Sequence, residues 1–274
     1  MIKSIFTALI LGLSLTTMRP LLAGSVEHVE TNDIREIWKY VSVNTVVIFE
    51  LENVCMTCTH QLGREEWADA YAKGQIRPEQ SFGEARGQIT PLWNHILCKA
   101  TMQPIDHSVQ KVIRDLQAKN IYTIGLSCKD PDIAYPMLGH LRSLDIDFLK
   151  HPPLNCHLAI RADHPAKFVD GVLFTGVYNH PGYVVANFLE SVRDCFRLVV
   201  VSNSLPRLQR IYQGVTCGGE RNGLSFVGIR LGLADQQIAT LDPKICEVQL
   251  KYFNKIISNE AAEVLLPPRS GWFW

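Results

Sequence analysis

A short apolar run that ends in two carboxylates restricts the folds open to this chain. Val46 to Phe49 are β-branched and aromatic residues, a pattern typical of a strand buried on both faces. Glu50 and Glu52 follow at once. Side chains two positions apart in a strand point to the same side, so we expect both carboxylates together. Open α/β sheets bind ligands beyond the carboxyl ends of their strands, which makes these acids a candidate site.

Strands alternate with amphipathic helices along most of the remaining chain. Further strands are predicted at Ile121–Leu126, Val172–Thr175, Leu198–Val201 and Leu224–Ile229. This alternation predicts an α/β fold, a mainly parallel sheet with helices on both faces. Right-handed crossovers bring the strand ends to one edge, so Ser127, His180 and Ser202 are expected to converge on Glu50.

The first residues have the pattern of a signal peptide, which we assign to residues 1–25. Lys3 precedes an apolar run from Ile5 to Leu15, and small residues at Ala23 to Ser25 suit cleavage. The run is shorter than the ~20 residues of a membrane span. We therefore expect an exported protein, periplasmic or secreted, with no stable membrane span after cleavage.

The charge balance excludes one class of partner. Lys and Arg together number 27, as do Asp and Glu, so the formal net charge is zero. A nucleic-acid-binding domain needs a basic surface, so we expect no nucleic-acid partner.

Three segments carry a resemblance to a known family: VVIFELENV followed by QLGREEW, GVLFTGVYNHPG, and the stretch from Phe226 to Leu266. In their order and spacing they resemble the haloacid-dehalogenase-like (HAD-like) superfamily of phosphatases, in its uncharacterised domain-of-unknown-function 2608 branch. The resemblance implies a HAD-like Rossmannoid domain over residues 26–270. It also implies a helical cap-like insertion at about 75–104.

The resemblance assigns a role to each residue at the strand ends. Glu50 takes the position of the nucleophile, Glu52 that of the general acid/base and Ser127 that of the phosphate-binding hydroxyl. The family's lysine falls near His180. Its metal-binding acids fall at Ser202 and Asn203.

All but Ser127 depart from the family's residue types. Glu places its carboxylate about 1.5 Å further from the backbone than the family's Asp, and an error of ~1 Å can cost ~100-fold in rate. Glu50, Glu52 and Asn203 would hold Mg²⁺ only weakly, because Asn brings no charge. We therefore expect impaired catalysis and a role in binding a small anionic ligand or a protein partner. A residual magnesium-dependent phosphatase is the alternative.

Two further patterns compete with this interpretation. Cys55 and Cys58 form a Cys-x-x-Cys between a strand and a helix, as in thiol-disulfide proteins. A disulfide between them, or two reduced thiols, is the simpler hypothesis.

A second cluster contains residue types found in zinc sites, at His151, Cys156, His157 and His164. Its spacing matches no common zinc pattern, and Pro152 and Pro153 indicate a loop. Solvent-exposed histidines are the alternative.

Overall fold

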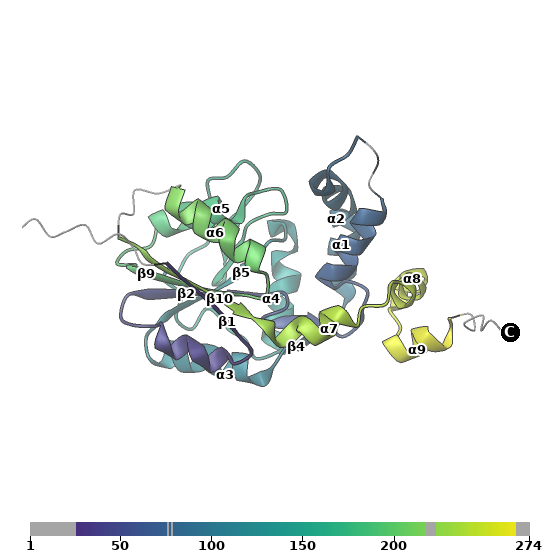
Figure 1. Ribbon diagram of the computed structural model, residues 1–274, viewed down its shortest axis with the longest axis horizontal. Coiled ribbons are helices and arrows are strands. Elements are labelled where there is room, and N and C mark those ends of the chain that lie inside the picture. Colours follow the sequence, from purple (N-terminus) through teal and green to yellow (C-terminus); the bar gives the residue numbers. More distant parts are fainter. Residues whose placement is uncertain (1–25, 76, 78, 218–222, 267–274) are drawn as a thin grey trace, which may run out of the picture.

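The computed structural model of the chain describes residues 26–75, 77, 79–217 and 223–266 (Figure 1). The predicted signal peptide lies outside these residues. Within them, no helix combines the length and the apolar character that crossing a membrane requires.

A sheet of eight strands forms the centre of the molecule, in the order β1-β10-β9-β2-β5-β8-β7-β6. From β1 to β8 in this order, neighbouring strands are parallel, while β7 and β6 are antiparallel to theirs. The bounds are β1 Val26–Thr31, β2 Thr45–Glu50, β5 Tyr122–Ser127, β6 Leu158–Ala159, β7 Lys167–Val169, β8 Val172–Phe174, β9 Arg197–Ser202 and β10 Ser225–Leu231.

Helices cover both faces of this sheet, with α3 on one side and α5 and α6 on the other (Figure 1). The helices are α1 Glu65–Gly74, α2 Phe82–Lys99, α3 His107–Ala118, α4 Ala134–Ser143, α5 Pro181–Glu190, α6 Leu205–Cys217, α7 Asp235–Ala239, α8 Pro243–Lys251 and α9 Asn259–Val264. Short 3-10 turns are η1 Ile34–Lys39, η2 Pro131–Ile133, η3 Gly232–Ala234 and η4 Phe253–Lys255.

Strand β2 shows why both faces are covered. Val47 and Phe49 belong to one hydrophobic cluster, whereas Val46 and Ile48 belong to the cluster on the opposite face. All six of its residues are buried. The apolar run therefore predicted the strand correctly, and the mainly parallel α/β sheet is confirmed.

The order of the strands defines where a site can form. From β2 the chain moves outward to β5 and β8, then crosses back to β9 and β10 on the other side of β2. The direction of winding thus reverses between β2 and β9. Crevices at such reversals, beyond the carboxyl ends of the strands, are the usual ligand sites of open α/β sheets.

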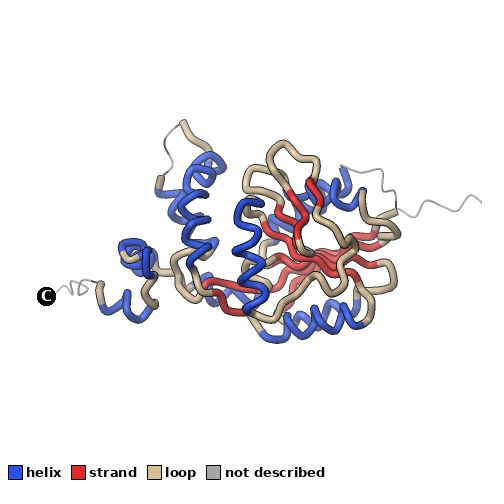
Figure 2. Tube along the Cα trace, turned by 180° about the vertical axis from the view of Figure 1, so that it is seen from behind, coloured by secondary structure: helices blue, strands red, loops and turns tan. Residues whose placement is uncertain are grey.

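The predicted insertion is a helical lobe beside the sheet (Figure 2). Helix α2 begins with a capping box between Ser81 and Glu84 and accommodates Pro91. It packs on α1, and a small antiparallel pair of strands, β3 Met56–Cys58 and β4 Met102–Pro104, lies at the base of the lobe. The lobe therefore begins earlier in the chain than the predicted residue 75.

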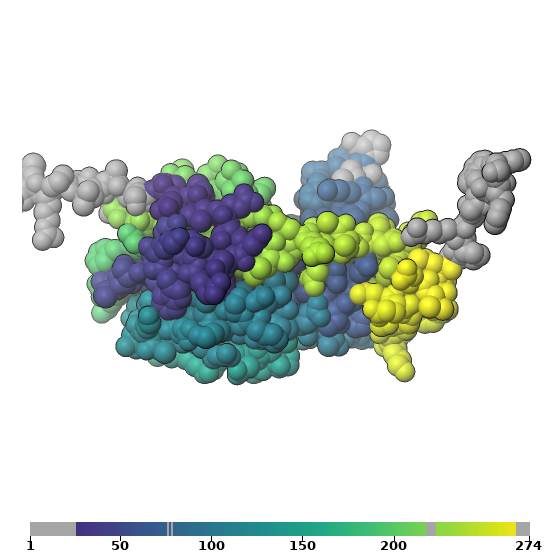
Figure 3. Space-filling model, turned by 60° about the horizontal axis from the view of Figure 1, so that its bottom comes forward, coloured from purple at the N-terminus to yellow at the C-terminus, as the bar shows by residue number. Residues whose placement is uncertain are grey.

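The C-terminal helices lie beside this lobe (Figure 3), and side-chain amides join them to its base. The Gln249 side chain accepts from the Leu62 N–H at 2.9 Å, and Asn259 accepts from the Gln61 N–H at 3.0 Å. Gln249 also donates to Asn259 at 3.0 Å. These bonds satisfy polar groups next to the loop that enters α1.

Candidate functional site

Glu50 ends β2 and has a cation for a partner. Its side chain is only 1% exposed. It accepts a hydrogen bond from the Ser202 hydroxyl, at the end of β9, and forms an ion pair with Arg207 in the first turn of α6. A buried carboxylate needs both charge pairing and hydrogen bonds. Because β9 and β2 are neighbours, the sheet itself delivers both partners.

Glu52 turns toward the other neighbour of β2. Asn53 adopts a positive φ of 62°, so the chain reverses after the strand and Glu52 faces β5. Its Oε1 accepts from the Ser127 hydroxyl at 2.8 Å and lies 3.8 Å from Lys129 Nζ. Burial raises the pKa of Glu52, while Lys129 acts in the opposite direction.

The ion pairs continue into the helical lobe. Glu65, at the start of α1, accepts from Arg207 Nη2 at 2.8 Å and from Arg86 Nη2 at 3.3 Å. Arg86 also forms an ion pair with Asp69. A chain of alternating charges therefore joins Glu50 in the sheet to α2 in the lobe.

One tryptophan completes the contact between sheet and lobe. The ring of Trp93 lies between Lys129 Nζ, 3.2 Å from its centroid, and Arg86 Cζ, 4.2 Å away. Its Nε1–H donates to the Gly63 carbonyl at 2.7 Å. Cation–π contacts strengthen when they are desolvated, and Trp93 is only 1% exposed.

The centre is closed in this conformation. The cavity that Glu52 and Trp93 line has a volume of about 20 Å³. A single water molecule needs at least ~10–15 Å³, so the cavity has room for about one. A phosphate ester does not fit without displacement of the lobe.

The structure brings together Glu50, Ser202 and Arg207 in one group, and Glu52, Ser127 and Lys129 in the other. Lys129 and Arg207 did not emerge from the sequence. Lys129 lies two residues after Ser127, and Arg207 lies on the first turn after β9, so both positions at the strand ends offered a signal.

His180 does not join either group. It precedes α5 and lines a separate cavity of about 360 Å³ with Arg161 and Asn179. Its ring contacts Tyr183, with the centroids 4.6 Å apart. Burial, with Arg210 as a smaller cause, lowers the pKa of His180. The described contacts therefore place His180 beside Tyr183 of α5, in a different cavity from the one that Glu52 lines.

Two of the predicted magnesium ligands have arginine partners. Glu50 is engaged by Arg207, and the backbone carbonyl of Asn203 accepts from Arg230 Nε at 3.1 Å. Across the described ranges, no group of three or more His, Cys, Asp or Glu side chains is placed to hold a metal ion.

The Cys-x-x-Cys segment is reduced and buried. Cys55 and Cys58 are both free thiols, and Cys58 lies in β3. Burial is the main cause that raises the pKa of both thiols, that of Cys58 to about 12. A reactive cysteine needs an exposed, stabilised thiolate, so this geometry gives no support to redox catalysis.

The histidines near residue 157 are also dispersed. His157 Nε2 lies 2.8 Å from Asp170, His151 stacks on Tyr122 and His164 packs on Tyr178. Each ring has a different neighbour. These contacts therefore give no support to a shared zinc site.

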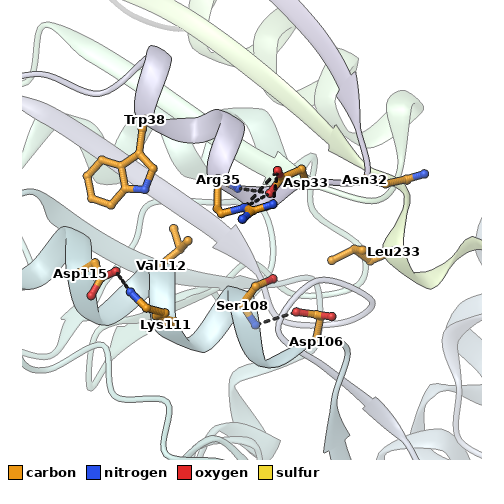
Figure 4. A pocket seen from close by; sticks show the side chains of 10 residues that line it. All are labelled: Asn32, Asp33, Arg35, Trp38, Asp106, Ser108, Lys111, Val112, Asp115 and Leu233. Carbon is orange, nitrogen blue, oxygen red and sulfur yellow. Dashed lines mark hydrogen bonds and ion pairs between the residues drawn. The ribbon is translucent and has the colours of Figure 1, made fainter.

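A larger groove lies between η1 and α3 (Figure 4). Its volume is about 580 Å³, within the ~300–1,000 Å³ typical of ligand pockets. Trp38 and Val112 form its apolar part, while Asp33–Arg35 and Lys111–Asp115 ion pairs form its polar part. None of the predicted site residues lines it.

Fold and site together define an α/β protein with a mainly parallel sheet and a closed, ion-paired centre at its strand ends. The chain belongs to the family described as "Protein of unknown function (DUF2608)", which matches residues 29–263.

Its relatives include proteins named "Putative outer membrane protein" in Chlamydia. One from Chlamydia pneumoniae is 25% identical over 252 residues, which covers 89% of this chain and 91% of the relative. One from Chlamydia trachomatis serovar D is 23% identical over 257 residues, covering 90% and 94% respectively.

Proposed function

We propose that the chain is an exported protein on a HAD-like fold whose strand-end centre no longer performs phosphoryl transfer, and that it acts in binding. Glu50, Ser127 and Ser202 stand at the positions where the resemblance places the reaction centre. The names of the Chlamydia relatives and the predicted signal peptide support export.

The ion pair between Glu50 and Arg207 carries this proposal. A nucleophilic carboxylate that also holds Mg²⁺ needs its oxygens free for phosphorus and for the metal. Here Arg207 and the Ser202 hydroxyl engage both oxygens. Phosphoryl transfer depends chiefly on positioning and on charge neutralisation by metal, and neither is available to an engaged, longer Glu side chain.

Turnover of an aryl phosphate tests the proposal. The purified chain, with and without Mg²⁺, should release no more phosphate than its Glu50→Ala variant. A magnesium-dependent rate that Glu50→Ala abolishes would support the residual phosphatase and overturn the proposed loss of activity.

The groove between η1 and α3 is where we place the binding role. Its size suits a small molecule, and it is larger than the cavity at the strand ends. Arg35 and Lys111 are its basic side chains, and both already pair with carboxylates. An anionic ligand would therefore compete with Asp33 and Asp115.

Hydrogen exchange distinguishes the groove between η1 and α3 from the strand ends as the ligand site. Ligands that raise the melting temperature in a screen of small polar molecules should protect η1 and the first turns of α3. Protection confined to Ser127 and the end of β2 would contradict this placement and return the role to the strand ends.

A further inference from the structure

Every methionine in the described part of the chain lines a single cavity. The sequence contains five methionines, and two of them lie before residue 26. Met56, Met102 and Met137 all line the small cavity below Trp93, and Cys58 lines it with them. Four sulfur-containing side chains from three different elements thus line one space of about 20 Å³.

The small β3–β4 sheet places three of these side chains on one face. Cys58 stands directly opposite Met102 in the antiparallel register. Met56 is two residues before Cys58, and side chains two apart in a strand share a face. The Cys58 Sγ lies 3.6 Å from Met102 Sδ. Met137 reaches the cavity from α4.

We propose that Met56, Cys58, Met102 and Met137 form a binding site for one Cu(I) ion. Thioether and thiolate sulfurs are soft ligands that select Cu(I) over the harder divalent cations. Two sulfurs bound to one metal, each at ~2.3 Å as in zinc–thiolate bonds, lie at most ~4.6 Å apart. The observed separation of 3.6 Å falls within that span.

The size of the cavity fits an ion without its water. A space for about one water molecule accepts a bare monovalent cation and excludes organic ligands. Carbon–sulfur side chains fill irregular cores without any metal. Apolar packing alone, however, does not require the thiol of Cys58 to face a thioether across the strand pair.

Binding at this site is coupled to a proton. In the metal-free protein the Cys58 thiol donates a hydrogen bond to Met102 Sδ, and it therefore carries its proton. Cu(I) then forms a bond to Sγ as the S–H bond breaks, and one proton passes to solvent. The affinity for Cu(I) should therefore rise as the pH rises.

Competition with a chromophoric chelator tests the site in the full chain. Exposed thiols at Cys98, Cys156 and Cys217 are alkylated first, and Cu(I) is supplied anaerobically as its bicinchoninate complex with ascorbate. We expect one Cu(I) per chain, with sulfur neighbours in its X-ray absorption spectrum. An absence of transfer, or a first shell of nitrogen and oxygen, would overturn the proposal.

Substitutions separate the site from adventitious binding. Met102→Leu keeps the volume and apolar character of the side chain, and such exchanges cost less than ~1.5 kcal/mol of stability. It should weaken Cu(I) binding by at least about tenfold, as should Cys58→Ser. The control Cys55→Ser removes a buried thiol that does not line the cavity and should leave affinity unchanged.

A circular-dichroism melt shows whether each variant is folded. An affinity that is equal in wild type and in folded Met102→Leu would make the cluster a packing feature and reject the site. An affinity that does not change with pH would likewise reject coordination by the Cys58 thiolate.

Discussion

Glu50 and Glu52 leave the same strand two residues apart, yet their surroundings differ. Glu50 is paired with a guanidinium and a hydroxyl from the β9 side. Glu52 has a hydroxyl and a more distant ammonium, 3.8 Å away, from the β5 side. Glu52 has a raised pKa and lines the small cavity beneath the lobe.

This difference separates two roles within one centre. In the group of Glu50, Ser202 and Arg207, the paired charges hold the end of β9 to β2. The Glu52 half carries a titratable acid beside the lobe. In the proposed function, Arg207 takes the place that the resemblance gives to a metal ion.

Removal of Arg207 should have the largest effect on stability. Arg207→Met leaves Glu50 buried without a cation, and breaking a buried pair costs about 3–5 kcal/mol. Urea unfolding measures the free energy of unfolding. The exposed Arg210 on the same helix provides a control, since Arg210→Met should change stability by less than ~0.5 kcal/mol. Equal losses of stability in Arg207→Met and Arg210→Met would contradict a buried ion pair between Glu50 and Arg207.

A smaller loss is expected at the contact between sheet and lobe. Trp93→Phe removes the hydrogen bond to the Gly63 carbonyl and weakens the contacts with Lys129 and Arg86. We expect a cost of about 1–2 kcal/mol in thermal or urea unfolding. A neutral result would show that the lobe is held by other contacts.

The pH dependence of stability should distinguish Glu52. Its folded pKa is raised above the unfolded value of about 4.3. The protonated form is therefore favoured by folding, and this contribution is lost as pH rises through the folded pKa. Relative to Glu52→Gln, the wild type should gain stability as the pH falls from 7 to the unfolded pKa of about 4.3. Parallel unfolding curves at both pH values would contradict the raised pKa.

The smallest effect is expected from the Cys55→Ser substitution in the Cys-x-x-Cys segment, measured as insulin reduction. The wild type should not reduce insulin in the presence of dithiothreitol beyond the rate of Cys55→Ser, because both thiols are buried and protonated. A rate that depends on Cys55 would restore the thiol-disulfide hypothesis.

The sequence predicted the elements whose residues are strongly apolar. The apolar run from Val46 to Phe49 predicted strand β2 correctly. Strand β1 was not predicted, because its half-exposed edge position carries Glu27, His28 and Glu30 among few apolar residues.

The partners within the centre were harder to predict than its strands. The spacing of Glu50 and Glu52 suggested a common direction, but the turn at Asn53 directs Glu52 toward β5. Arg207 reaches Glu50 from the first turn of α6. Such side-chain contacts depend on packing between segments that are remote in the sequence, so local sequence patterns do not predict them.

A double-mutant cycle between Glu50 and Arg207 tests the central claim, that Arg207 is the resident cation of this centre. Unfolding free energies of Glu50→Gln, Arg207→Met and the double variant give the coupling energy directly. We expect a coupling of about 2–3 kcal/mol, with the double variant more stable than Arg207→Met alone. Additive losses, with no coupling, would mean that the pair does not form and would contradict the account.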